Sequence, residues 1–179
     1  MAGRTKLYRL LRDNENPMEE GIKAKLPHED KTPLQHIRHG SRQDSQWIST
    51  SRHLSDIDEL IRFKRKHEGW SRQCRVVEID EQKLKLYAEM SKDIMRQLVN
   101  IMKKKAVKKP RKMMKLLTQF LEQTTGKVLD FTDQTVLDRY IPSDSFGLNE
   151  KARGYARKYS EVLVERFIPA DCCIRICKR

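Results

Sequence analysis

The chain has 179 residues and is 37% hydrophobic, which is enough for one ordinary domain, so we expect a single domain over residues 1–179. No run of about 18 apolar residues is present and the first residues lack the apolar core of a signal peptide, which predicts an intracellular protein, cytoplasmic or nuclear, with no membrane partner. A net charge of +13 predicts attraction to polyanions.

Short strands and helices alternate along the chain. Aliphatic and aromatic residues predict strands over residues 5–11, 46–51, 73–79 and 127–132. A helix after the second strand is predicted from residues at helical spacing, Leu54, Ile57, Leu60 and Ile61, with Ser55 and Asp58 as its capping box. Residues 135–141 indicate a short helix and residues 149–160 a helix or loop.

The last β-segment covers residues 158–176, and it breaks at Pro169 before a further strand formed by "CCIRI". These elements predict an α+β domain with a small, mainly antiparallel sheet. The four cysteines, Cys74, Cys172, Cys173 and Cys177, are expected to be reduced thiols, because the compartment is intracellular and three crowd the last strand. Their spacing matches no common metal site, so no metal is predicted.

The segment from Lys103 to Lys115, "KKKAVKKPRKMMK", carries eight cations and no acid. Apolar residues at helical spacing on both sides predict two amphipathic helices in a basic helical insertion over residues 88–127. Pro110 is expected near the start of the second helix and Gly126 at its end. The segment is open to three interpretations: a solvated connection, a nuclear-import signal, or a polyanion contact. The contact would use Lys103, Lys104, Lys105, Lys108, Lys109, Arg111 and Lys112.

Three polar sites interrupt the apolar strands and are candidates for chemistry. Arg9 in "LYRLL" must meet an anion or several acceptors, unless its head reaches solvent. Ser49 in "WISTS" carries a hydroxyl at a strand end, where such residues hold ligands or cap the following helix. Glu161 opens "EVLVE", where it is either a desolvated carboxylate or an edge-strand charge.

In this order, the three sites resemble the motifs of the ADP-ribosyltransferase superfamily, in its Arg-Ser-Glu branch of mono-ADP-ribosyltransferase toxins and ecto-enzymes. "YR" at Tyr8-Arg9, "STS" at Ser49-Thr50-Ser51 and "EVLV" at residues 161–164 carry the resemblance. It covers residues 7–87 and about 128–176. The basic section between them has no counterpart.

The resemblance implies an ADP-ribosyltransferase-like split β-sandwich with flanking helices, which binds NAD as substrate and breaks its nicotinamide-ribose bond. Arg9 would bind a phosphate or the adjoining ribose, Ser49 would hold Arg9 and the nicotinamide-side ribose, and Glu161 would bind the ribose 2′-hydroxyl. Further NAD contacts are expected from Tyr8, Thr50, Ser51, His36, Gly40 and Trp47.

One position departs from the family pattern. Arginine-modifying members carry an acid two residues before the catalytic Glu and many others a glutamine, whereas this sequence has Tyr159. Tyr159 either presents its ring to the acceptor or packs, and Glu165 is a second candidate for the catalytic acid. Three functions are therefore compatible with the sequence: a mono-ADP-ribosyltransferase with an unknown protein or nucleic-acid acceptor, an NAD glycohydrolase, and an inactive module that binds nucleic acid or an acidic partner.

Overall fold

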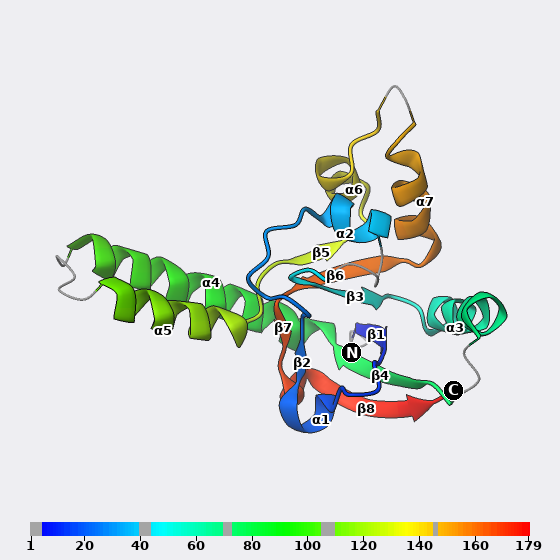
Figure 1. The fold of residues 1–179 in the computed structure, drawn as a ribbon, viewed down its shortest axis with the longest axis horizontal. Helices are drawn as coiled ribbons and strands as arrows, with labels where there is room; N and C mark the ends of the chain where they lie inside the picture. Colours follow the sequence, from blue (N-terminus) through cyan, green and yellow to red (C-terminus); the bar gives the residue numbers. More distant parts are fainter. Residues whose placement is uncertain (1–4, 40–43, 70–72, 105–109, 145–146) are drawn as a thin grey trace.

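The computed structural model describes residues 5–39, 44–69, 73–104, 110–144 and 147–179, without the side chains of residues 102–104 and 110–114 (Figure 1). The strands are β1 (Lys6–Leu10), β2 (Ile22–Lys23), β3 (Trp47–Ser51), β4 (Arg75–Asp80), β5 (Val128–Asp130), β6 (Glu161–Glu165), β7 (Phe167–Ile168) and β8 (Cys173–Lys178). The helices are α1 (Pro17–Glu20), α2 (Pro33–His39), α3 (Leu54–Glu68), α4 (Glu81–Lys104), α5 (Pro110–Glu122), α6 (Gln134–Tyr140), α7 (Glu150–Lys158) and the 3-10 turn η2 (Ala170–Cys172).

Six strands form one sheet in the order β5-β6-β3-β1-β4-β8, and β2 pairs with β7 in a second, two-stranded sheet. Every pairing between these strands is antiparallel. The predicted α+β class and antiparallel sheet are confirmed. The strand after the break at Pro169 is also confirmed, as β8.

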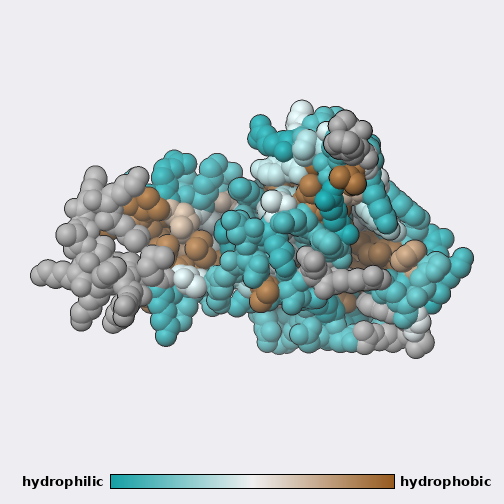
Figure 2. Space-filling view, turned by 45° about the horizontal axis from the view of Figure 1, so that its top comes forward, coloured by the Kyte–Doolittle hydropathy of each residue, from teal (hydrophilic) through white to brown (hydrophobic). Residues whose placement is uncertain are grey.

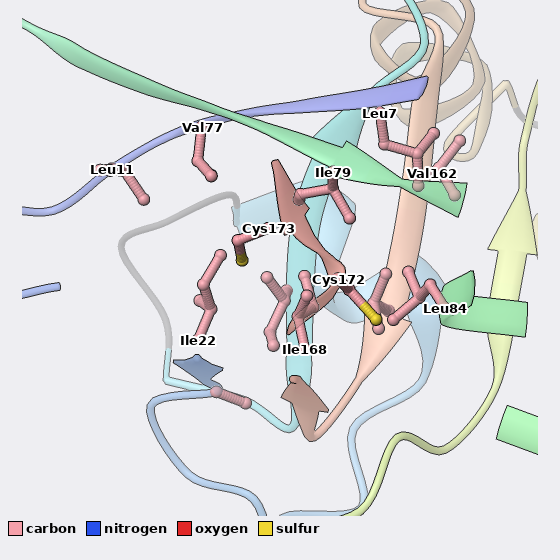
Figure 3. Close-up of a cluster of buried hydrophobic side chains, with 13 residues drawn as sticks. Leu7, Leu11, Ile22, Val77, Ile79, Leu84, Val162, Ile168, Cys172 and Cys173 are labelled. Carbon is pink, nitrogen blue, oxygen red and sulfur yellow. The ribbon is translucent and has the colours of Figure 1, made fainter. Parts of the chain in front are cut away.

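The aliphatic triplet of β6 reflects burial of the strand on both faces. Val162 and Val164 lie in a core cluster between the large sheet and the two-stranded sheet, whereas Leu163 lies in a cluster on the opposite face. Figure 3 shows the first cluster, in which Cys173 lies on the side of Ile22 and Cys172 on the side of Leu84. A strand covered on both faces reads as a continuous apolar run rather than as an alternating pattern.

All four cysteines are free thiols, as predicted. Cys172 and Cys173 belong to the core cluster of Figure 3, so they act there as small apolar side chains. Burial raises the pKa of both thiols to about 12, so neither forms a thiolate near neutral pH.

The helices α4 and α5 run side by side and project from the sheets as a hairpin (Figure 1). The two helices thus cover residues 81–104 and 110–122, and Pro110 begins α5 as predicted. Hydrophobic side chains gather on the surface of this hairpin (Figure 2), and several on α4 are exposed: Leu86, Met90, Ile94, Val99 and Ile101. Of the cations predicted to contact a polyanion, Lys105, Lys108 and Lys109 and the side chains of Lys103, Lys104, Arg111 and Lys112 lie outside the described part of the chain.

Two predicted helix boundaries are wrong. Ser55 lies inside α3 and its hydroxyl donates to Asp56, whereas His53 occupies the N-cap position and the Ser51 hydroxyl accepts from the His53 N–H at 3.2 Å. Gly126 does not end α5, which stops at Glu122. The N–H of Gly126 donates to the Glu165 carbonyl at 2.9 Å instead, and an added Cβ would overlap the Glu165 side chain.

Candidate active site

The candidate site begins where two neighbouring strands of the large sheet diverge. β1 pairs with β3 at Tyr8 and Ser51. One residue further along β1, the Arg9 Nη1 donates to the main-chain carbonyl of Ser49 at 2.8 Å. The Arg9 guanidinium thus takes the place of a strand N–H as the donor to the Ser49 carbonyl, at the point where β1 and β3 separate. This bond holds the guanidinium at the edge of a cleft. The contact expected between Arg9 and Ser49 therefore exists, but it uses the carbonyl of Ser49 rather than its hydroxyl.

A buried carboxylate that the sequence did not single out holds two arginines at this edge. Glu15 is 8% exposed and accepts from Arg9 Nη2 at 2.9 Å and from Arg12 Nε at 2.8 Å. Burial by itself would raise the pKa of Glu15, but the charges and hydrogen bonds of Arg9 and Arg12 outweigh it and hold that pKa below its usual range. The buried Nε of Arg9 has no hydrogen-bond partner within the described residues.

Three side chains form a chain of hydrogen bonds that leads to Glu161. His36 Nδ1 lies 2.6 Å from the Ser45 hydroxyl, and His36 Nε2 lies 3.0 Å from the Ser49 hydroxyl. The Ser49 hydroxyl lies beside the Glu161 carboxyl group, whose pKa it lowers. If Ser49 donates to Glu161, its oxygen accepts from the Nε2–H of His36, and Nδ1 accepts from Ser45. Each hydroxyl or N–H in this series therefore donates toward the Glu161 carboxylate.

His36 stays neutral within this chain. Burial lowers its pKa to about 4, and the positive charges of Arg9, Lys25 and Lys31 act in the same direction. The imidazole is 5% exposed and belongs to the short helix α2. A neutral ring donates through one nitrogen and accepts through the other, which is what the two serine contacts require.

Glu161 is partly buried at the start of β6, beside the Ser49 hydroxyl. Burial raises its pKa from 4.5 to about 7, although the Ser49 hydrogen bond and the charge of Arg9 oppose the rise. Its main chain is held on both sides, because its carbonyl accepts from Phe131 at 2.9 Å and the Ser160 carbonyl accepts from Arg52 at 3.0 Å. The site therefore contains a carboxyl group close to its half-ionised state at neutral pH.

These groups open onto one cavity of about 470 Å³, a volume typical of small-molecule sites. Polar residues of its lining include Arg9, Arg12, His36, Ser45, Ser49 and Glu161. Apolar and aromatic residues form another part of the wall, including Leu10, Ile57, Leu60, Phe63, Trp47 and Tyr159. The tertiary structure thus brings together Arg9, Ser49, His36 and Glu161 from four different elements.

Other residues named from the sequence line the cavity but have structural bonds of their own. The Thr50 hydroxyl donates to the Val162 carbonyl at 2.7 Å and so joins β3 to β6. The Ser51 hydroxyl serves the turn into α3, as the alternative interpretation of "STS" predicted. The indole N–H of Trp47 donates to the Lys31 carbonyl at 2.7 Å, and its ring packs in the core cluster that contains Leu163.

Tyr8 packs beside the cluster of α3 side chains and is absent from the cavity lining as described. Gly40 lies outside the described residues. Glu165, the second candidate for the catalytic acid, accepts from the Lys127 N–H at 2.9 Å and pairs with Arg166 at 3.1 Å. It does not appear in the cavity wall, so the geometry favours Glu161 between the two.

Within the described residues, no cluster of His, Cys, Asp and Glu side chains has the arrangement of a metal site. In the same part of the chain, no helix combines the length and apolar character needed to cross a membrane.

Among solved structures, this chain is similar to EcPltA, with a TM-score of 0.53 and 16% sequence identity over 99% of this chain and 77% of that chain. No protein-family model matches the sequence, and no curated protein matches it. At this identity the likeness concerns the fold alone. The chain thus has an α+β fold similar to that of EcPltA, and this fold is compatible with the ADP-ribosyltransferase-like fold that the sequence motifs resemble.

Proposed function

We propose that this protein is an NAD-dependent mono-ADP-ribosyltransferase. The observation that carries the proposal is the convergence of Arg9, Ser49 and Glu161 on one cavity, with Glu161 at a raised pKa. The resemblance of the three motifs and the likeness of fold support the same function. Perturbed titratable groups in a cavity are typical of catalytic sites.

The chemistry needs a cation for the substrate's phosphates and an anion near the sugar carbon. Arg9 and Arg12 supply positive charge at one side of the cavity, which attracts a phosphate group. Glu161 accepts a hydrogen bond from the ribose 2′-hydroxyl and stabilises the positive charge that develops at C1′. His36 acts through Ser49, whose hydroxyl it orients toward Glu161.

The proposed reaction needs only NAD and an acceptor as reactants. The bond between C1′ and the nicotinamide nitrogen breaks, and its electron pair leaves with nicotinamide, which needs no proton because its ring is already cationic. The acceptor's nucleophilic atom forms the new bond to C1′ and gives up its proton. With water as the acceptor, the same steps describe an NAD glycohydrolase.

The test is nicotinamide release from NAD, measured with the wild-type protein and with Glu161→Gln, in buffer and with cell extract. We expect turnover with wild type and a loss of at least a hundredfold with Glu161→Gln, because removal of one electrostatic contact to a transition state costs about 10²–10³ in rate. Glu165→Gln, in the same strand but outside the cavity wall, is the matched control and should retain activity. Equal rates for wild type and Glu161→Gln, or no turnover by wild type in any extract, would reject the proposal.

Labelled NAD separates the transferase from the glycohydrolase. Label that becomes attached to a macromolecule in extract indicates transfer, whereas free ADP-ribose at equal rates with and without extract indicates hydrolysis. Mass spectrometry of the labelled product then identifies the acceptor.

A second proposed function rests on the basic segment rather than on the cavity. Eight cations without an acid between Lys103 and Lys115 suit a module that binds nucleic acid or an acidic partner. Replacement of Lys103, Lys104, Lys105, Lys108 and Lys109 by Gln should then weaken polyanion binding and flatten its dependence on salt. An unchanged salt slope would reject this function.

A further inference from the structure

Aromatic side chains lie exposed at the cavity, beyond the groups assigned to NAD. Phe63 of α3 lines the cavity and is 43% exposed, with its ring 4.6 Å from that of His67. Tyr159 also lines the cavity, and its ring stacks on Tyr155 with centroids 6.1 Å apart and an angle of 18° between their planes. Tyr155 is itself 43% exposed. An exposed Phe thus lines the cavity together with Tyr159, whose stacked partner Tyr155 is exposed beside it, so planar groups can stack on these rings.

Positive charges accompany both aromatic groups. Lys158 lies over the Tyr159 ring, 5.4 Å from its centroid. On α3, the exposed Lys66 follows Phe63 by three residues, so the two lie on the same face of the helix.

Three acids on or near the same surface have cationic partners. Glu59 pairs with Lys158 at 2.8 Å and Glu68 pairs with Lys64 at 3.0 Å. Asp58 pairs with Arg179 at 3.6 Å. The surface at the cavity therefore presents exposed rings next to cations, and its carboxylates are partly neutralised.

We infer that the acceptor of the proposed transferase is a single-stranded nucleic acid, which this surface binds; the inference rests on the function proposed above. Bases of a single strand stack on Phe63 and on the Tyr155–Tyr159 pair, and phosphates lie near Lys66 and Lys158. Exposed aromatic rings beside cations are how proteins bind single strands, because every base has a planar face and every link has a charge. In a duplex the bases are already stacked on one another, so this surface selects single strands.

The same arrangement is a poor match for an acidic protein. A carboxylate-rich peptide pairs with the cations but leaves the rings at the cavity without partners. In the proposed reaction, a nucleophilic nitrogen or oxygen of the nucleic acid forms the bond to C1′ as nicotinamide leaves with the electron pair, and the proton of that atom is released. The rings hold the acceptor at the opening through which it approaches C1′.

Fluorescence anisotropy with labelled probes tests the inference: 20-nucleotide dT and rU strands, a 20-base-pair duplex, and polyglutamate of similar charge. The background carries Gln at Lys103, Lys104, Lys105, Lys108 and Lys109, so that the basic segment does not dominate the signal. We expect the single strands to bind at least tenfold more tightly than the duplex and polyglutamate. The two single strands, compared with each other, show whether the surface prefers DNA or RNA.

Phe63→Ala and Tyr155→Ala should each weaken single-strand binding about tenfold, the usual effect of removing a stacked aromatic side chain. Met18→Ala is the matched control, because Met18 is also 43% exposed but is not part of the described cavity wall. It should leave the affinity unchanged.

Two results would overturn the inference: no single-strand binding in this background, or equal binding of dT and polyglutamate that Phe63→Ala and Tyr155→Ala leave unchanged. The outcome is independent of NAD chemistry, because Glu161→Gln should lose nicotinamide release but keep its affinity for the strand. A protein that cleaves NAD and binds no strand rejects the nucleic-acid acceptor alone. A protein that binds the strand and cleaves no NAD rejects the transferase alone.

Discussion

Glu161→Gln should stabilise the protein at alkaline pH and not at acid pH. Glu161 has a folded-state pKa of about 7 against the ordinary value of 4.5, because burial disfavours its charged form. A group whose pKa rises on folding stabilises the fold below its unfolded pKa, and this contribution is lost as the pH rises through the folded pKa. Wild type therefore loses stability between about pH 4.5 and pH 7, while a neutral glutamine does not.

The size of the effect follows from the two pKa values. At about 1.4 kcal/mol for each pH unit, a rise from 4.5 to about 7 corresponds to about 3 kcal/mol at full ionisation. Unfolding temperatures of domains of this size change by about 2–4 °C for each kcal/mol, so Glu161→Gln should melt about 10 °C above wild type at pH 8.5. At pH 4 the two proteins should melt at nearly the same temperature.

The assay is thermal and urea unfolding of both proteins at pH 4, 5.5, 7 and 8.5. Glu165→Gln is the control from the same strand, because Glu165 is paired with Arg166 and bonded to the Lys127 N–H, so its loss should destabilise the fold. A difference between Glu161→Gln and wild type that stays constant across this pH range, or that grows toward acid pH, would refute the assignment of Glu161 as a desolvated carboxylate.

Three further substitutions test the scaffold of the site. Ser160→Gly should stabilise the protein by about 0.5–1 kcal/mol in urea unfolding, because Ser160 has a φ of 43° next to Glu161 and glycine adopts such angles without strain; a loss of stability would contradict this. Glu81→Gln should reduce the free energy of unfolding by about 3 kcal/mol at pH 7, because hydrogen bonds from Arg52 overcome the effect of burial and lower the pKa of Glu81 to about 2. This contribution is present above pH 4.5 and is lost toward pH 2, so the difference in stability between the variant and wild type should disappear in acid. Gly126→Ala should destabilise the fold by about 1–3 kcal/mol in the same urea assay, because its Cβ would overlap the side chain of Glu165. An unchanged urea midpoint would show that the Glu165 side chain moves aside without a cost in stability.

The strands and long helices could be predicted because their signals are local. Aliphatic runs such as residues 162–164 and helical spacing such as that around Ile57 and Ile61 follow from burial of one or two faces of an element. The segment between β1 and β3 could not be predicted in the same way. Its elements α1 and β2 have four and two residues, too few to show a period.

Glu15 was missed for the same reason, although one signal pointed to it. Two arginines, Arg9 and Arg12, precede it within six residues, and a partly buried arginine requires an acceptor. That requirement predicts an acid but does not say which one, because the chain holds 25 acids and the pairing depends on the fold.

The sequence by itself determined the α+β class, the reduced cysteines and the order of the three motifs, because side-chain type and local spacing are enough for these features. Only the tertiary structure decided which polar residues meet at the cavity and which bind the scaffold. Arg9 reaches the Ser49 carbonyl because β1 and β3 diverge there. His36 belongs to the seven-residue helix α2, which is too short to show a clear periodic pattern of apolar residues in the sequence. Thr50 and Trp47, equally suited by chemistry, hold the strands and the core instead. Residues far apart in the chain acquire a common role only through the packing that sets the distances between them.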